Sequence, residues 1–213
     1  MGAEPTTDGL RRDILAGTFA PGERLVELQL TKRYGVGRAA VRSALIELAA
    51  EGLVDREANR GAVVRRMSLR EVIQITEARS ALESLLASHA AREADDHERA
   101  ELLEIERRMR RAVSGGEHVE YSELNALLHR RIREVSRHTV ASDLVANLKN
   151  RAARHQYRLA LLPGRPDASL VQHADIVTAI VAGDQVGAGD AMRVHLESVL
   201  DSLRRWGELG LEV

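Results

Sequence analysis

Four polar side chains stand on helix faces that are otherwise apolar, and together they could hold a metal ion. Asn125 and His129 are four residues apart, so they share one face of a predicted helix. His173 and His195 recur within the aliphatic stripes of two later predicted helices. A single histidine on such a stripe is more often a hydrogen-bonded core residue. Three imidazoles and an amide in one helical core need compensation, and a divalent ion would supply it.

The ligand types narrow the choice of ion. The chain has no cysteine, so disulfides and thiolate metal sites are excluded. Three neutral nitrogens and one neutral amide oxygen favour zinc or nickel among the available ions. Such a ligand set leaves the charge of the ion exposed to an incoming anion.

A fifth polar residue, Arg79, lies on an apolar stripe that includes Ile75 and Leu82. An unpaired guanidinium there would be costly, so Arg79 must be paired. One candidate partner is Glu83, one helical turn further on. The other is the carboxylate of a small effector, which a guanidinium can bind through two parallel hydrogen bonds. Both pairings can hold together, with Glu83 orienting Arg79.

A second group of candidate residues lies near the start of the chain and fits contact with DNA. A predicted helix over residues 38–51 buries Val41, Ala44, Leu45 and Leu48 at helical spacing. Its exposed side carries cations, and small residues in its first turn would let the backbone approach a phosphate or a base edge. The candidate contacts on this recognition helix are Arg38, Ala39, Ala40 and Arg42.

A predicted β-hairpin follows the recognition helix. Strands over 53–56 and 62–65 flank a connection whose Asn59 and Gly61 suit positive φ. Arg60 and Gly61 at the tip of this wing are placed to enter a minor groove or to touch phosphates.

These residues must be positioned mainly by helices. Of the 213 residues 44% are hydrophobic but only 2% are aromatic, so the core is built from aliphatic side chains, which favours helices over a sandwich or barrel. The net charge of −1 argues against a general nucleic-acid binder. The chain shows no signal peptide and no run of 18 apolar residues, so we expect a cytoplasmic protein without membrane attachment.

The sequence predicts two domains, 1–67 and 68–213. A capping box over Ser68–Glu71 begins the second domain. The expected fold is mostly α: an N-terminal winged helix-turn-helix with a small β-hairpin wing, followed by an all-α six-helix bundle. The bundle helices are expected over residues 69–93, 97–113, 118–136, 139–162, 169–183 and 186–207.

The segment Asp13–Val64 resembles the winged helix-turn-helix of the GntR superfamily of bacterial transcription regulators. The family run Ser-Arg-Thr-Pro-Val-Arg-Glu-Ala-Leu corresponds to GRAAVRSAL over Gly37–Leu45, which keeps both arginines but lacks the hydroxyls and the proline. In the second domain, Arg79-x-x-Leu82-Glu83 resembles a motif of the FCD effector domain found in the FadR-like branch.

The FCD resemblance also bears on the metal ligands. Metal-binding members of that family look like Asp-x-x-x-His followed by two more histidines. Asn125, His129, His173 and His195 fall at those places, with Asn125 where the family has Asp. The resemblance therefore implies a metal site, with Arg79 near the effector.

The expected function is a transcription regulator, a repressor controlled by a small carboxylate effector. One recognition helix contacts few base pairs, so a homodimer on a palindromic operator is expected. Two alternatives stay open at this point: a metal sensor in which the ion is the signal, and a metal-dependent hydrolase. The hydrolase is disfavoured because no Asp or Glu stands at a short fixed spacing from the histidines to act as general base.

Overall fold

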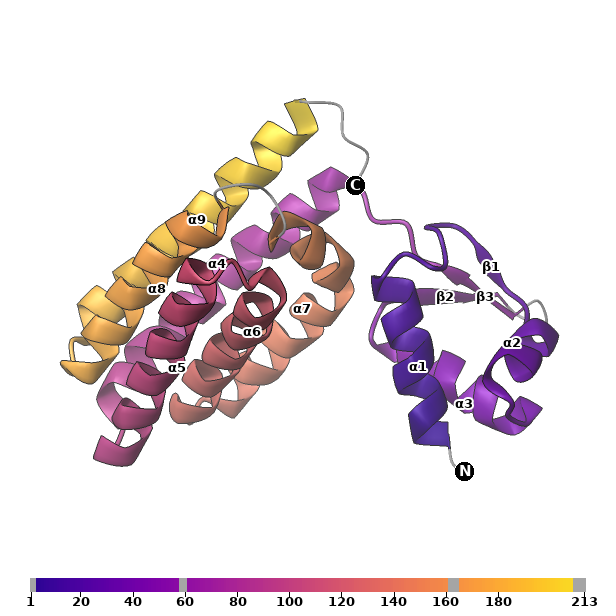
Figure 1. Cartoon of the computed structure of the whole chain (residues 1–213), viewed down its shortest axis with the longest axis horizontal. Coiled ribbons are helices and arrows are strands. Elements are labelled where there is room, and N and C mark those ends of the chain that lie inside the picture. Colours follow the sequence, from indigo (N-terminus) through magenta and orange to yellow (C-terminus); the bar gives the residue numbers. More distant parts are fainter. Residues whose placement is uncertain (1–2, 58–60, 161–164, 209–213) are drawn as a thin grey trace. The chain divides into compact units, whose positions relative to one another are not determined.

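The computed structural model describes residues 3–57, 61–160 and 165–208 and divides the chain into two compact units (Figure 1). The first unit comprises Met1–Ser68 with Lys149–Arg154, and the second comprises Leu69–Leu148 with His155–Val213. In these described ranges, no helix combines the length and hydropathy that crossing a bilayer requires.

The first unit contains helices α1 (Ala3–Leu15), α2 (Glu27–Tyr34) and α3 (Arg38–Ala50). Both α1 and α2 pack against α3. The side chains of α3 that were predicted to face the core are buried, which confirms that part of the helix pattern. These side chains are Val41, Ala44, Leu45 and Leu48.

The helix-turn-helix depends on one glycine. The cap of α2 is Gly35, whose φ of 65° is left-handed, and its N–H bonds to the carbonyl oxygen of Thr31. Glycine adopts this backbone without a steric penalty, so the chain can leave α2 and enter α3 three residues later.

Helix α1 begins at Ala3. Pro5 is compatible with that start, because the first turn of a helix needs no N–H from its residues.

The wing is part of a three-stranded antiparallel sheet with the order β1-β3-β2. Its strands are β1 (Arg24–Leu25), β2 (Val54–Glu57) and β3 (Gly61–Val64). The pairing of Arg24 with Val63 adds β1 to the hairpin as a third strand. The connection from β2 to β3 is outside the described residues, and so is Arg60.

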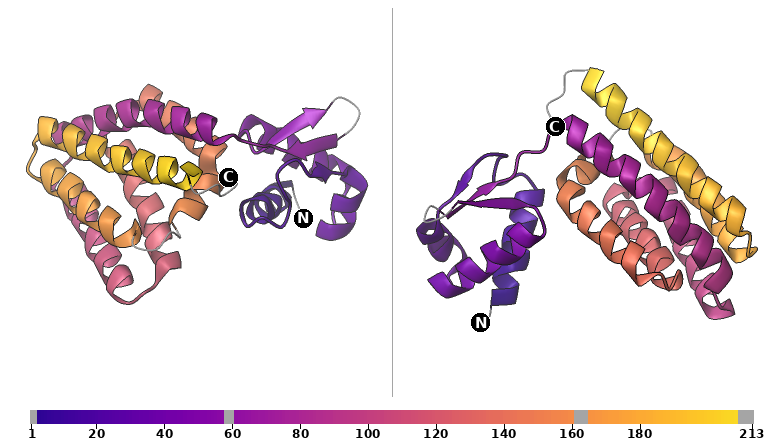
Figure 2. Two further views of the ribbon diagram at one scale, coloured as in Figure 1. Left: turned by 90° about the horizontal axis from the view of Figure 1, so that it is seen from above. Right: turned by 180° about the vertical axis from the view of Figure 1, so that it is seen from behind.

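The second unit contains the six expected bundle helices. They are α4 (Leu69–Glu93), α5 (Asp96–Ser114), α6 (His118–Val135), α7 (Thr139–Ala160), α8 (Arg165–Val181) and α9 (Gln185–Glu208). Helix α4 packs along α9 and also against α6 and α8, while α5 packs against α6 and α8 (Figure 2). The first and last helices of the unit are thus neighbours.

The core between these helices is aliphatic, as the composition requires. Its members from α5, α6, α8 and α9 include Leu102, Met109, Leu128, Ile176 and Met192. Each is at most 1% exposed. The polar groups of α6, α8 and α9 that are described next are enclosed in this apolar surrounding, where electrostatic interactions are strong.

Candidate metal centre and nucleic-acid interface

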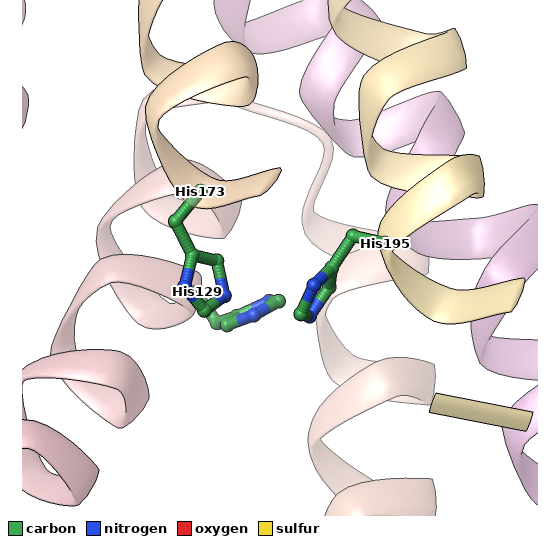
Figure 3. A group of neighbouring side chains, drawn as sticks. All are labelled: His129, His173 and His195. Atoms are coloured by element: carbon green, nitrogen blue, oxygen red, sulfur yellow. The ribbon is translucent and has the colours of Figure 1, made fainter. Parts of the chain in front are cut away.

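Three imidazoles from three helices converge inside the second unit (Figure 3). His129 comes from α6, His173 from α8 and His195 from α9. Their ring centroids are 5.4, 5.3 and 4.4 Å apart for the pairs 129–173, 129–195 and 173–195. One ligand nitrogen from each ring lies within 4.8 Å of the others. All three side chains are buried, so this histidine cluster is a candidate metal centre.

Two of the rings are oriented by acceptors on other helices. Nδ1 of His129 lies 2.7 Å from Oε2 of Glu83, and Nδ1 of His195 lies 3.1 Å from Oε1 of Gln172. A carboxylate and an amide oxygen only accept hydrogen bonds, so chemistry assigns the proton of each ring to Nδ1. In a neutral ring that is protonated at Nδ1 the electron pair lies on Nε2, the atom through which such a ring can bind a metal.

The third ring, His173, has its Nδ1 3.4 Å from the Tyr121 hydroxyl oxygen. Burial raises the pKa of Tyr121 to about 12, and the Ser169 hydroxyl hydrogen-bonds the same phenol. The phenol therefore stays neutral near pH 7. Each of the three rings thus has a partner at Nδ1, which is how metal-ligating histidines are usually held in place.

Burial also lowers the pKa of His195 well below its ordinary value of 6.5, and the charges of His173, His129 and Arg165 lower it further. A depressed pKa means that the imidazole is neutral near pH 7. A neutral imidazole has the electron pair that a metal ion needs, so the electrostatics fit a ligand role.

Asn125 stands one turn before His129 on α6. Its side-chain oxygen is buried and has no hydrogen-bond partner in the described part of the chain. Leaving a buried acceptor unsatisfied costs about 1–3 kcal/mol. An orphaned oxygen next to a converging histidine set fits a metal site, because an ion would satisfy it.

The predicted pairing of Arg79 with Glu83 is present. Nε and Nη2 of Arg79 lie 2.8 and 2.7 Å from Oε1 of Glu83, and both side chains are buried. Because the other carboxylate oxygen of Glu83 contacts His129, the three residues form a continuous chain: Arg79, Glu83, His129. The guanidinium neutralises the carboxylate that orients a candidate ligand.

Sequence reasoning missed several residues of this site. It paired Glu83 only with Arg79, and it did not select Tyr121, Gln172 or Arg165. Tyr121 stands eight residues before His129, and Arg165 stands eight before His173, so both share a helix face with a candidate ligand. That spacing was the available signal for these two residues. The sequence contains no such signal for Gln172, because this residue of α8 contacts His195 on a different helix, α9.

The predicted DNA contacts on α3 lie on its surface. Arg38, Ala39 and Arg42 are exposed and Ala40 is half-buried. The N-cap of α3, Gly37, provides no side-chain hydrogen bond. The first N–H groups of α3 therefore have no side-chain cap, and helix N–H groups in that state bind phosphate readily.

Two of the predicted contacts also have roles within the first unit. Nε of Arg42 lies 2.9 Å from Oε2 of Glu27 on α2, in an exposed ion pair. Gly61 opens β3 with a φ of +90°, and a Cβ at this position would lie 2.8 Å from the carbonyl oxygen of Leu25. Gly61 is therefore needed by the sheet itself.

The arrangement defines a class of protein: a winged helix-turn-helix unit joined to a helical unit with a buried polar site. Comparison with known families agrees. Residues 3–64 match the family described as bacterial regulatory proteins, gntR family, and residues 74–198 match the FCD domain. The chain belongs to the GntR family of bacterial transcription regulators, in the branch that has an FCD effector-binding domain.

Similar proteins support this assignment. The chain is 30% identical over 196 residues to the HTH-type transcriptional repressor RspR of Escherichia coli, covering 92% of this chain and 86% of RspR. It is 28% identical to the HTH-type transcriptional repressor GlaR of the same organism, covering 88% of this chain and 89% of GlaR. These relatives and both families are transcription regulators, so the hydrolase alternative is set aside.

Solved structures show the same fold. E. coli McbR/YncC matches with a TM-score of 0.80 at 20% identity, covering 95% of this chain and 97% of the other. A putative GntR transcriptional regulator from Rhodococcus sp. RHA1 matches with a TM-score of 0.72 at 22% identity, covering the same shares. The expected fold class, mostly α with a winged helix-turn-helix and a helical second part, is confirmed.

Proposed function

We propose that this protein is a repressor that binds a palindromic operator as a homodimer and is controlled by a small carboxylate bound at a metal ion in the histidine cluster. The observation that carries the proposal is the arrangement of three buried imidazoles, each held through Nδ1. A partner at Nδ1 is the usual arrangement for a histidine that binds a metal through its other ring nitrogen.

The proposed ligands of the ion are Asn125, His129, His173 and His195. The donor set of three nitrogens and one oxygen, all neutral, supports zinc or nickel. Bound there, a divalent ion supplies a positive charge that attracts the oxygen of an anion. The protein contributes the neutral state of His195, the fixed ring orientations and the exclusion of water from the core.

Arg79 was proposed as the contact for the effector carboxylate, and it stays a candidate for that role. Its bonds to Glu83 give it a second role, because a buried carboxylate without a cation would be protonated or displaced. We therefore propose that Arg79 holds Glu83 in place and directed at His129.

At the DNA, the proposed contacts are Arg38, Ala39, Ala40 and Arg42 of α3, with Arg60 and Gly61 of the wing. The arginines would supply charge and base recognition, and the small residues would allow close approach. Two copies are required for useful specificity, because each recognition helix reads only part of a site.

Binding of the purified protein to its operator tests this function. After the operator has been selected from genomic fragments, binding is measured with chelated protein, with zinc or nickel alone, and with the metal plus a panel of carboxylic acids. Release only by metal and acid together supports a carboxylate-controlled repressor. Release by metal alone supports the metal-sensor alternative instead. Operator binding that neither the metal nor the acids change contradicts both readings.

A further inference from the structure

A buried cation near the histidine cluster, Arg165, has no anionic partner among the residues that the structure describes. Arg165, the first residue of α8, is 9% exposed. Its Nη1 donates to Oγ of Ser198 at 2.7 Å, and its Nη2 is buried without a hydrogen-bond partner among the described residues. A hydroxyl satisfies one donor but does not neutralise the charge. A buried charge in this state is costly unless an anion joins it.

Arg165 belongs to a polar column on the buried face of α8. Arg165, Ser169 and His173 are spaced four residues apart, so they stand one above another. All three are buried. The Ser169 hydroxyl bonds to Tyr121, and Tyr121 contacts His173. The column therefore leads from the guanidinium to the histidine cluster through polar groups.

Helix α9 shows how close the guanidinium comes to the cluster. Ser198, which accepts from Arg165, stands three residues after His195 on the same helix. Three residues are one turn or less, about 4.5 Å along the axis. The Ser198 hydroxyl that holds the guanidinium thus stands on the turn of α9 that follows His195.

We propose that Arg165 binds the carboxylate of the effector, while a second oxygen-bearing group of the same molecule faces the histidine cluster. This inference rests on the proposed function and extends it. In contrast to Arg79, whose Nε and Nη2 both contact Glu83, Arg165 has a donor, Nη2, without a partner in the described ranges.

The two ends of the polar column select a ligand class. An acid that contacts both the guanidinium and the histidine cluster needs two oxygen-bearing groups on one short carbon chain. A hydroxy-dicarboxylate such as malate has this form. Acetate is too short to reach both groups, so it serves as the negative control.

The first experiment needs no ligand. Arg165→Met and Arg79→Met are compared by thermal unfolding of the chelated protein. Arg165→Met is expected to keep or raise Tm, because it removes a buried charge that has no anion. Arg79→Met is expected to lower Tm, because it leaves Glu83 buried without its cation. A fall in Tm for Arg165→Met as large as that for Arg79→Met would make Arg165 a structural residue and overturn the inference.

The second experiment measures binding of malate, citrate, gluconate and acetate to the zinc-loaded protein by calorimetry. An acid that binds the wild type is expected to bind Arg165→Met about ten- to hundred-fold more weakly, the loss typical of one charged hydrogen bond. Arg165→Lys should recover part of that loss, since it restores the charge without the planar fork. Arg193→Gln, which removes an exposed arginine of α9, should change nothing.

The two proposals fail differently. If an acid binds the wild type and Arg165→Met equally well, the role of Arg165 is wrong while carboxylate control stands. If none of the acids binds the zinc-loaded wild type, the carboxylate part of the proposed function fails. The role of Arg165 is then tested by the thermal comparison alone. A retained or raised Tm for Arg165→Met supports a site for an anion of another chemical class.

Discussion

Glu83 and His129 are on different helices, α4 and α6, and Oε2 of Glu83 lies 2.7 Å from Nδ1 of His129. The other oxygen of the same carboxylate is held by Arg79. A carboxylate at Nδ1 fixes the tautomer of the imidazole and makes Nε2 a stronger electron-pair donor. The orientation of the His129 ring in the cluster therefore depends on how α4 packs against α6.

Glu83→Gln should weaken zinc binding by about 10- to 100-fold, the loss typical for a partner of a metal-ligating histidine. The amide still accepts a hydrogen bond but carries no charge. Affinity is measured by competition with a chromogenic chelator, and circular dichroism checks the helix content. Glu77→Gln is the control, because Glu77 is an exposed carboxylate of the same helix. Equal zinc affinity in Glu83→Gln and Glu77→Gln would show that Glu83 does not support the metal ligands.

Asn125→Asp should bind zinc more tightly than the wild type, because a charged oxygen replaces a neutral one next to the ion. The added negative charge should also weaken the binding of any acid that responds to the metal. Asn125→Leu should lose affinity for zinc. Direct titration of all three proteins tests the series, and identical affinities would show that residue 125 is not a ligand.

The chelated protein should lose stability as the pH falls below about 6.5. The pKa of His195 is depressed in the folded state, so the unfolded chain binds more protons once its own histidines titrate near 6.5. The contribution is present above that pH and is lost as the pH falls toward the folded pKa. Urea unfolding between pH 8 and pH 5 measures the slope.

His195→Gln should flatten this pH dependence. His97→Gln is the control, because the side chain of His97 is 81% exposed. A slope that is unchanged in His195→Gln would assign the pH effect to other groups.

Arg42→Ala should lower operator affinity by about 1–3 kcal/mol if its guanidinium reads a base. Affinity for a random duplex should fall less, because phosphate contacts are shared by all sequences. Fluorescence anisotropy at fixed salt gives both values. Arg12→Ala, which removes an exposed arginine of α1, is the matched control. A variant that binds the operator normally would contradict the role.

Gly61→Ala should lower the free energy of unfolding by about 1–2 kcal/mol, because an L-residue with positive φ is strained. The contact of its Cβ with the carbonyl oxygen of Leu25 adds to this loss. Gly37→Ala is the comparison, since its φ is −74° and a Cβ there meets nothing within 4 Å. Similar denaturant midpoints for the two variants would show that the wing adapts to a side chain at residue 61.

The sequence predicted much of the helical framework. The limits of α4, residues 69–93, agree with the expected helix because its apolar periodicity is long and unbroken. The start of α8 was missed. Pro163, Gly164 and Pro166 indicated a loop up to residue 168, yet α8 begins at Arg165, because a helix accepts proline in its first turn. Arg165 was thereby placed in a linker and overlooked.

The candidate site was only partly accessible from the sequence. Helical spacing indicated that His129, His173 and His195 point inward, because each lies on an aliphatic stripe. The contacts of Glu83 and Gln172 with these rings depend on the register between packed helices. Local periodicity contains no information about that register, so only the three-dimensional structure could reveal these contacts.

The histidine cluster gathers α6, α8 and α9 from separate parts of a chain that contains no cysteine. An ion held by residues 129 and 195 would close a loop over the intervening chain, as a disulfide does in secreted proteins. Closing a long loop removes conformational entropy from the unfolded chain. The same ion that prepares the protein for its effector would then also act as a reversible cross-link, and chelation would loosen the fold without breaking a covalent bond.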